Sequence, residues 1–257
     1  MKTIILPEKT VHAGNLILVN AQHAFHAGIE ECRLVPVNKE TNGVFLERRA
    51  AALLSGLMNG IDGWAQISAV SGWRSKREQE AIFDQSLKEN GPEFTEKFVA
   101  KPDCSEHQTG LAIDLGLKKP QIDFIRPDFP YSGICQTFRE KAIPYGFIER
   151  YPQGKEDITG ITHEPWHFRY VGAPHAAIMT KMSFTLEEYL SFLKDFAFGK
   201  RRFDYQTDRQ HVSVSYVETA GSTDTAIEIN ADIPYSVSGN NVDGFVLTEW
   251  RNGNVER

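Results

Sequence analysis

Two short segments of the chain hold the residue types that bind metal ions. One contains His107 and Asp114, and the other contains His163, Glu164 and His167. Zinc hydrolases bind their metal through neutral imidazole nitrogens and carboxylates, and they leave one position open for water. A histidine near an aspartate is more often a structural hydrogen-bonded pair, so the first segment alone is weak evidence. The second segment adds imidazoles and a carboxylate, and the two together indicate a zinc site.

The run from His163 to His167 also matches the pattern H-E-x-x-H, in which two histidines one helical turn apart bind zinc. Pro165 argues against this interpretation, because the residue before a proline is biased away from helical geometry. We therefore expect Glu164 to be extended, and the alternation that follows it is typical of a strand. His163 and His167 are then not expected to share a helical face.

The helical alternative stays open at this point, as the less favoured one. Glu187 and Glu188 lie at a distance downstream that suits a third ligand of such a site. Acidic residues in the first turn of a helix are, however, ordinary complements of the helix dipole.

The residues between these segments predict the elements that position them. Ser75 and Glu78 form a capping-box pattern at the start of a helix, and Asn90-Gly91-Pro92 ends it. Helices are expected at 46–58, 76–89, 134–142, 173–181 and 186–196, and strands at 65–71, 111–115, 147–148 and 167–171. Alternating runs beyond residue 200 predict antiparallel hairpins.

These elements predict an α+β fold, in which a small antiparallel sheet with flanking helices cradles the metal site. We expect a catalytic domain over residues 1–199 and a small β-rich C-terminal appendage over residues 200–257.

The composition of the chain argues against nucleic-acid binding, secretion and membrane insertion. The net charge of -6 and the pI near 5.8 exclude the basic face that a nucleic-acid binder needs. The N-terminal residues lack the features of a secretory signal, and no run approaches the roughly 20 apolar residues of a membrane span. We expect a cytoplasmic protein without a membrane anchor, in which Cys32, Cys104 and Cys135 are free thiols.

Four motifs together resemble a known family. They are SGWRS (71–75), SEHQTGLAID (105–114), YGFIERY (145–151) and EPWHFRYVG (164–172). They resemble the VanY/VanXY-type zinc D,D-peptidases (peptidase family M15B), most closely the bifunctional VanXY D,D-dipeptidase/D,D-carboxypeptidases, among them the VanG type. The resemblance covers roughly residues 15–200, with the motifs in matching order. The remainder of the chain lies outside it.

The resemblance implies a role for each motif residue. Carried over by position, it makes His107, Asp114 and His167 the ligands of one Zn²⁺ per chain. Glu164 becomes the catalytic base and Arg74 the cation that stabilises the transition state. The resemblance also suggests that Gln66 and Ser105 bind the terminal D-residue of the substrate, although as bare residues both also fit a surface or structural role.

Residue chemistry agrees with two of these roles. Glu164 is three residues from a ligand, close enough to take a proton from water and to deliver it to the departing amine. Arg74 carries a permanent positive charge on a planar guanidinium group, which suits the stabilisation of an oxyanion.

The function expected from the sequence is therefore a zinc metallopeptidase acting on small peptides. The resemblance implies hydrolysis of D-Ala-D-Ala, of the terminal D-Ala of peptidoglycan precursor pentapeptides, or of both, which would confer vancomycin resistance. Two alternatives stay open. One is an L,D-carboxypeptidase or other cell-wall peptidase of the same fold, and the other is a non-catalytic zinc-containing binding module.

Overall fold

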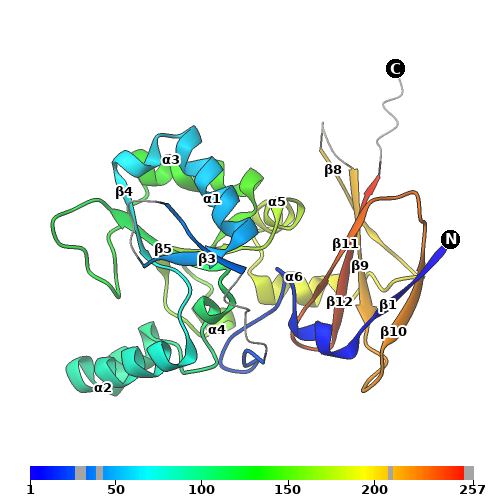
Figure 1. The fold of residues 1–257 in the computed structure, drawn as a ribbon, viewed down its shortest axis with the longest axis horizontal. Coiled ribbons are helices and arrows are strands. Elements are labelled where there is room, and N and C mark those ends of the chain that lie inside the picture. The colour runs from blue at the N-terminus through cyan, green and yellow to red at the C-terminus, as the bar shows by residue number, and fades with distance from the viewer. Residues whose placement is uncertain (27–32, 39–42, 208–210, 252–257) are drawn as a thin grey trace. The chain divides into compact units, whose positions relative to one another are not determined.

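The computed structural model describes residues 1–26, 33–38, 43–207 and 211–251 (Figure 1). Cys32 lies outside the described residues. Contacts divide the chain into two compact units. One unit comprises Val19–Thr185 and holds all four sequence motifs, and we call it the motif unit. The other comprises Met1–Leu18 with Leu186–Arg257, and we call it the terminal unit.

A four-stranded antiparallel sheet forms the centre of the motif unit. Its order is β4-β5-β7-β6, with β4 at Ile67–Ser71, β5 at Ala112–Leu117, β7 at Glu164–Tyr170 and β6 at Phe147–Tyr151. A hairpin of β2 (Leu34–Pro36) and β3 (Phe45–Glu47) accompanies it. Successive side chains of a strand point to opposite faces of a sheet, so each central strand can serve a core and a site at once.

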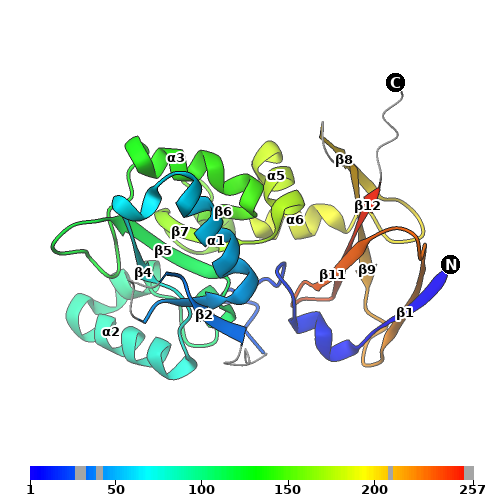
Figure 2. The same cartoon turned by 45° about the horizontal axis from the view of Figure 1, so that its top comes forward.

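Helices cover this sheet on both faces. They are α1 (Arg48–Gly60), α2 (Lys76–Phe98), α3 (Gly133–Ala142), α4 (Glu156–Thr159) and α5 (Ala173–Met182), with 3₁₀ turns η3 (Gly63–Ala65), η4 (Glu106–Thr109) and η5 (Ile143–Tyr145). Two views show α1 and α3 on one side of the sheet and α2 on the other (Figures 1 and 2).

The hydrophobic core lies between the sheet and the pair α1 and α3. Leu54 of α1 and Phe138 of α3 are fully buried there, together with Ile113 of β5 and Phe168 of β7. The side chain of Glu47 caps α1 by accepting hydrogen bonds from the backbone N–H groups of its first turn. The face of β5 and β7 opposite this core is left for polar residues.

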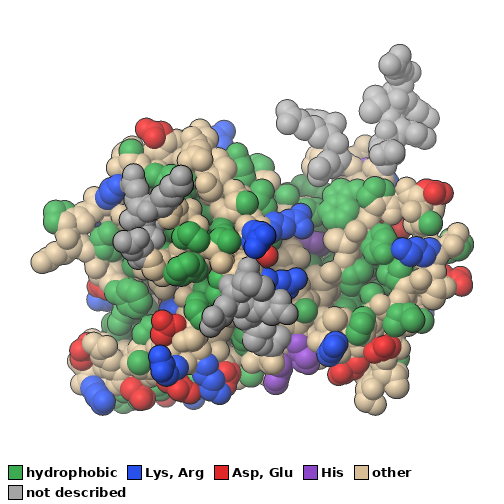
Figure 3. All heavy atoms as spheres, in the orientation of Figure 1, with side chains coloured by type: hydrophobic (Ala, Val, Ile, Leu, Met, Phe, Trp, Pro, Cys, Tyr) green, Lys and Arg blue, Asp and Glu red, His purple; other side chains and the backbone are tan. Residues whose placement is uncertain are grey.

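Helix α2 is a surface helix with charged side chains of both signs along its exposed length (Figure 3). The predicted capping box is confirmed, because Ser75 and Glu78 exchange side-chain-to-backbone hydrogen bonds. The predicted stop at Gly91 is confirmed only in part. Gly91 is non-helical (φ 79°), but the chain resumes its helix at Pro92, which is tolerated in a first turn.

The terminal unit is rich in β-strands, as expected for the C-terminal region. It contains a four-stranded sheet of order β11-β12-β9-β8 and a pair β1-β10. The strands are β1 (Lys2–Leu6), β8 (Phe203–Gln206), β9 (His211–Glu218), β10 (Thr225–Ile229), β11 (Tyr235–Gly239) and β12 (Gly244–Arg251), with helix α6 (Leu186–Leu193) and 3₁₀ turn η1 (Glu8–His12). Phe245, Leu247 and Ile229 are buried in its core.

The pairing of β1 with β10 brings residues from both ends of the chain into the terminal unit. A sequence pattern does not show this, because antiparallel partners can lie any distance apart along the chain. A boundary near residue 200 between independently folding domains stays a prediction. The α+β fold with a strand-rich C-terminal region is confirmed. Among the described residues, every helix is too short or too polar to cross a membrane.

Phe138 provides a test of the core. Its ring packs edge-on against Phe129 and Phe168, with centroids 5.7 and 4.8 Å away, and it is fully buried. Phe138→Ala should lower the free energy of unfolding by about 3–5 kcal/mol, because a buried aromatic ring leaves a cavity. Denaturant titration measures this change. Ile158→Ala, at an exposed position of α4, is the control; equal small losses for both variants would contradict this description of the core.

Candidate metal centre

Adjacent strands β5 and β7 bring Asp114 and His167 together. The two residues are direct cross-strand partners, and both point away from the core that buries their neighbours Ile113 and Phe168. His107 lies on the short turn η4, which leads into β5. Gly110 ends that turn in the left-handed region (φ 70°), which a glycine adopts without strain, and so allows the sharp turn expected from the sequence.

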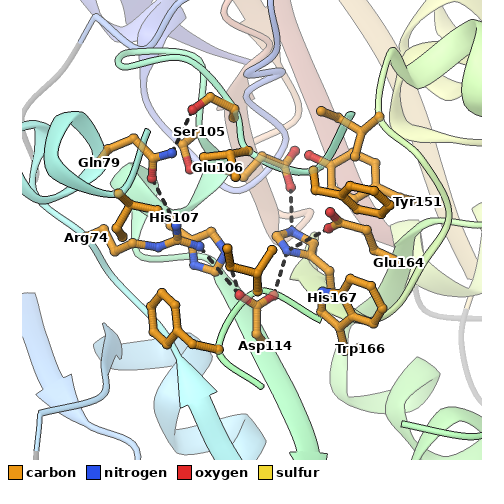
Figure 4. Close-up of a pocket in the computed structure, with 17 residues that line it drawn as sticks. Arg74, Gln79, Ser105, Glu106, His107, Asp114, Tyr151, Glu164, Trp166 and His167 are labelled. Carbon is orange, nitrogen blue, oxygen red and sulfur yellow. Dashed lines mark hydrogen bonds and ion pairs between the residues drawn. The ribbon is translucent and has the colours of Figure 1, made fainter. Parts of the chain in front are cut away.

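The three side chains form a buried group that could hold a metal ion (Figure 4). One nitrogen or oxygen from each lies within 4.8 Å of the others. His107 Nε2 is 3.1 Å from Asp114 Oδ2, and His167 Nδ1 is 2.9 Å from Asp114 Oδ1. Donor atoms from positions 107, 114 and 167 thus converge on one point, although 53 residues separate the two strand positions.

His107 is held in the tautomer that a ligand needs. Its Nδ1–H donates a hydrogen bond to the carbonyl oxygen of Gly72 at 2.7 Å, so Nε2 keeps its lone pair toward Asp114. Burial and the charge of Arg74 lower the pKa of His107 to about 4. The imidazole is therefore neutral at neutral pH, as metal binding requires.

Asp114 is the anion of the group. Burial opposes its ionisation, but the neighbouring imidazoles outweigh burial and hold the pKa of this carboxyl well below its usual range. For His167 burial favours the neutral ring, but the adjacent carboxylates of Asp114 and Glu106 outweigh burial and raise its pKa to about 9. A cation is thus favoured at the position between Asp114 and the two rings.

Glu164 is the first residue of β7 and lies beside His167. Its Oε2 is 3.8 Å from His167 Nδ1, and its side chain points into the same pocket (Figure 4). The strand geometry confirms the expectation that Glu164 is extended. Burial raises the pKa of Glu164 to about 8, which is close to the value that suits a proton carrier at neutral pH.

Arg74 lies across the pocket from Glu164. Its guanidinium group donates to Gln79 Oε1 at 3.0 Å and lies 3.5 Å from Asp114 Oδ2. Gln79 is held in turn by the carbonyl oxygen of Ala100. Arg74 Nε is buried and has no hydrogen-bond partner among the described residues, and the guanidinium group lines the pocket.

The two residues expected to bind the substrate have different positions. Ser105 is buried and lines the pocket. Gln66 is exposed at the end of η3 and does not line it, so the structure does not bring Gln66 together with the others. Trp166 and Tyr151 complete the wall around His167.

His163 does not join the metal group. Its Nε2 lies 2.7 Å from the hydroxyl of Tyr131, and the two rings are stacked. Because Glu164–Tyr170 is a strand, the helical H-E-x-x-H site is absent from this part of the structure.

Sequence reasoning missed several buried polar residues beside the site. Glu106 forms ion pairs with Arg150 and Arg169, and Gln79 holds Arg74. Burial opposes ionisation of Glu106, but the two guanidinium groups outweigh burial and lower the pKa of its carboxyl. One signal was available for Arg169, which lies two residues after His167 and therefore on the same face of a strand.

Comparison with known proteins places this arrangement in a family. The family model described as VanY, D-alanyl-D-alanine carboxypeptidase, matches residues 45–173. The bifunctional D-Ala-D-Ala dipeptidase and D-Ala-D-Ala carboxypeptidase VanXYC of Enterococcus gallinarum is 44% identical over 179 residues, which are 69% of this chain and 94% of that protein.

Solved structures agree with the family match. The vancomycin resistance D,D-dipeptidase VanXYg, in complex with a D-Ala-D-Ala phosphinate analogue, is 48% identical with a TM-score of 0.93, covering 97% of this chain and 99% of that one. A mutant of the vancomycin resistance D,D-pentapeptidase VanY from a VanB-type cassette, in complex with Zn(II), is 30% identical with a TM-score of 0.55, covering 68% and 98%. This chain is an enzyme and belongs to the VanY family of D-alanyl-D-alanine carboxypeptidases.

Proposed function

We propose that this protein is a zinc-dependent D,D-peptidase that hydrolyses D-Ala-D-Ala and the C-terminal D-Ala of peptidoglycan precursors, and thereby confers vancomycin resistance. The observation that carries the proposal is the convergence of His107, Asp114 and His167 within 4.8 Å in a buried pocket that Glu164 and Arg74 share. The relatives named above support the choice of substrate, since their descriptions name D-Ala-D-Ala or its analogue.

The donor set fits zinc. Two imidazoles and one carboxylate are the ligands that zinc takes in hydrolases, and the lone pair of His107 Nε2 already faces Asp114. A zinc ion held by His107, Asp114 and His167 would supply Lewis acidity, which polarises a carbonyl and activates water. The relative solved with Zn(II) supports this choice of metal.

Glu164 serves as the proton carrier. Its carboxylate takes a proton from the attacking water molecule and delivers it to the amine that leaves as the peptide bond breaks. Burial raises the pKa of Glu164 to about 8, and a cation bound at the three ligands would favour the carboxylate form that accepts the proton. Trp166 and Tyr151 shield the pocket around it, which strengthens charge interactions there.

Arg74 stabilises the negative charge that develops on the carbonyl oxygen. Gln79 fixes one side of its guanidinium group, which lines the pocket and presents a fixed positive charge to the new oxyanion. Ser105, also in the wall, offers a hydroxyl to the free carboxylate of the terminal D-residue. Hydrolysis there removes the D-Ala-D-Ala ends that vancomycin binds.

A panel of substrates with metal removal tests this function. The zinc-loaded protein should hydrolyse D-Ala-D-Ala and a pentapeptide precursor, and it should leave a tetrapeptide with an L,D-linked terminus intact. A chelator should abolish both activities, and added Zn²⁺ should restore them. Cleavage of the L,D-tetrapeptide alone would identify an L,D-carboxypeptidase instead. Absence of any hydrolysis with zinc fully bound would favour a binding module.

Substitution of Glu164 tests the proton carrier. Glu164→Gln keeps the shape of the side chain but cannot accept the proton, so kcat should fall by about 10²- to 10⁴-fold while the zinc content stays unchanged. Steady-state kinetics and metal analysis measure the two quantities. Glu96→Gln, at an exposed position of α2, is the matched control and should leave kcat unchanged. Turnover near the wild-type rate in the Glu164 variant would remove this residue from the mechanism.

A further inference from the structure

A buried carboxylate lies behind the predicted metal ligand His167. Glu106, on the turn η4, is enclosed with Arg150 of β6 and Arg169 of β7, and all three side chains have an exposed fraction of 0%. Arg150 Nε donates to Glu106 Oε1 at 2.8 Å, and Arg169 donates to the same oxygen at 2.7 Å. Both guanidinium groups therefore hold Oε1 and leave Oε2 free to point elsewhere.

Glu106 Oε2 points toward the ring of His167. It lies 3.6 Å from His167 Nε2, and each of these atoms is buried without a hydrogen-bond partner among the described residues. An unpaired buried polar atom is costly, and here an acceptor and a possible donor face one another. A shift of a few tenths of an ångström joins them, so the pair is arranged to form one hydrogen bond.

The other nitrogen of His167 belongs to the metal group. Nδ1 lies 2.9 Å from Asp114 Oδ1, and a neutral imidazole carries its single proton on one of its two nitrogens. A ring that offers the lone pair of Nδ1 to a metal must therefore carry its proton on Nε2. That proton needs an acceptor, and Glu106 Oε2 is the atom placed to receive it.

We propose that Glu106 is a positioning residue, which accepts a hydrogen bond from His167 Nε2–H and so fixes the tautomer and ring orientation that present Nδ1 to the metal. Arg150 and Arg169 aim the carboxylate by holding its other oxygen. The inference deepens the proposed function and rests on it.

The two histidines of the group are then oriented by different means. For His107, the backbone carbonyl of Gly72 accepts from Nδ1 at 2.7 Å. His167 is in the middle of a strand whose backbone groups pair with β5 and β6. A side chain from another element must therefore supply the acceptor, and Glu106 on η4 does so.

A competing role for Glu106 is merely to neutralise the two buried guanidinium groups. The triple variant Glu106→Leu/Arg150→Met/Arg169→Met separates the two roles, because it removes both guanidinium groups together with the carboxylate that they hold. Competition with a chromogenic chelator measures its affinity for Zn²⁺. The proposal predicts binding weakened by about 10- to 100-fold relative to wild type, as expected when a ligand loses its orienting partner. Wild-type affinity in the folded triple variant would overturn it.

Nuclear magnetic resonance of the wild-type protein gives a test that needs no variant to fold. With ¹⁵N-labelled histidine and bound Zn²⁺, the proposal predicts that His167 carries its proton on Nε2 and that this proton exchanges slowly with solvent. A proton on Nδ1 would overturn the proposal while hydrolysis of D-Ala-D-Ala still supported the proposed function. Failure of the wild-type protein to bind Zn²⁺ would overturn both.

Discussion

The cross-strand pair of Asp114 and His167 is the interaction on which the rest of the site depends. It is set by the register of β5 and β7, in which these residues are direct partners 2.9 Å apart through Oδ1 and Nδ1. A slip of either strand by one residue would exchange the faces of that strand and turn its site residue into the core. The apolar neighbours Ile113 and Phe168 oppose such a slip, because it would expose them. Packing of the core against α1 and α3 thus fixes the chemistry on the opposite face.

Charge balance is the second constraint on this face. Asp114, Glu164 and Glu106 are buried carboxylates, and Arg74, Arg150 and Arg169 lie among them as counter-charges. Buried charges of one sign persist only when they are paired or bind a metal, and removing one partner leaves the other uncompensated. Glu106 and Glu164 differ, however, in how strongly their carboxylates are paired. Glu106 is held by two guanidinium groups, whereas Glu164 faces His167 at 3.8 Å and has its pKa raised to about 8 by burial. The same pocket therefore contains one carboxylate fixed in its ionised form and another free to carry a proton.

Much of this arrangement could be predicted from the sequence, and the failures have physical causes. Pro165 indicated that Glu164 is extended, and the alternation after it predicted the strand that rules out a helical H-E-x-x-H site. The family motifs then named His107, Asp114 and His167, which the structure brings together. The resemblance suggested that Gln66 binds the substrate. Gln66 lies at the exposed end of η3 and does not line the pocket, whereas Gln79 of α2 contacts Arg74. Gln79 reaches the pocket from α2, and Arg150 of β6 meets Glu106 of η4 although 44 residues separate them. The local periodicity of the sequence predicts neither of these contacts.

We propose that one zinc ion binds to His107, Asp114 and His167. Diffraction from crystals of the zinc-loaded protein, recorded on both sides of the zinc absorption edge, tests it most directly. We expect a single anomalous peak in this pocket, about 2.0–2.2 Å from His107 Nε2, His167 Nδ1 and a carboxylate oxygen of Asp114. A peak bound instead by His163, or ligation of His167 through Nε2, would contradict this assignment of the ligands.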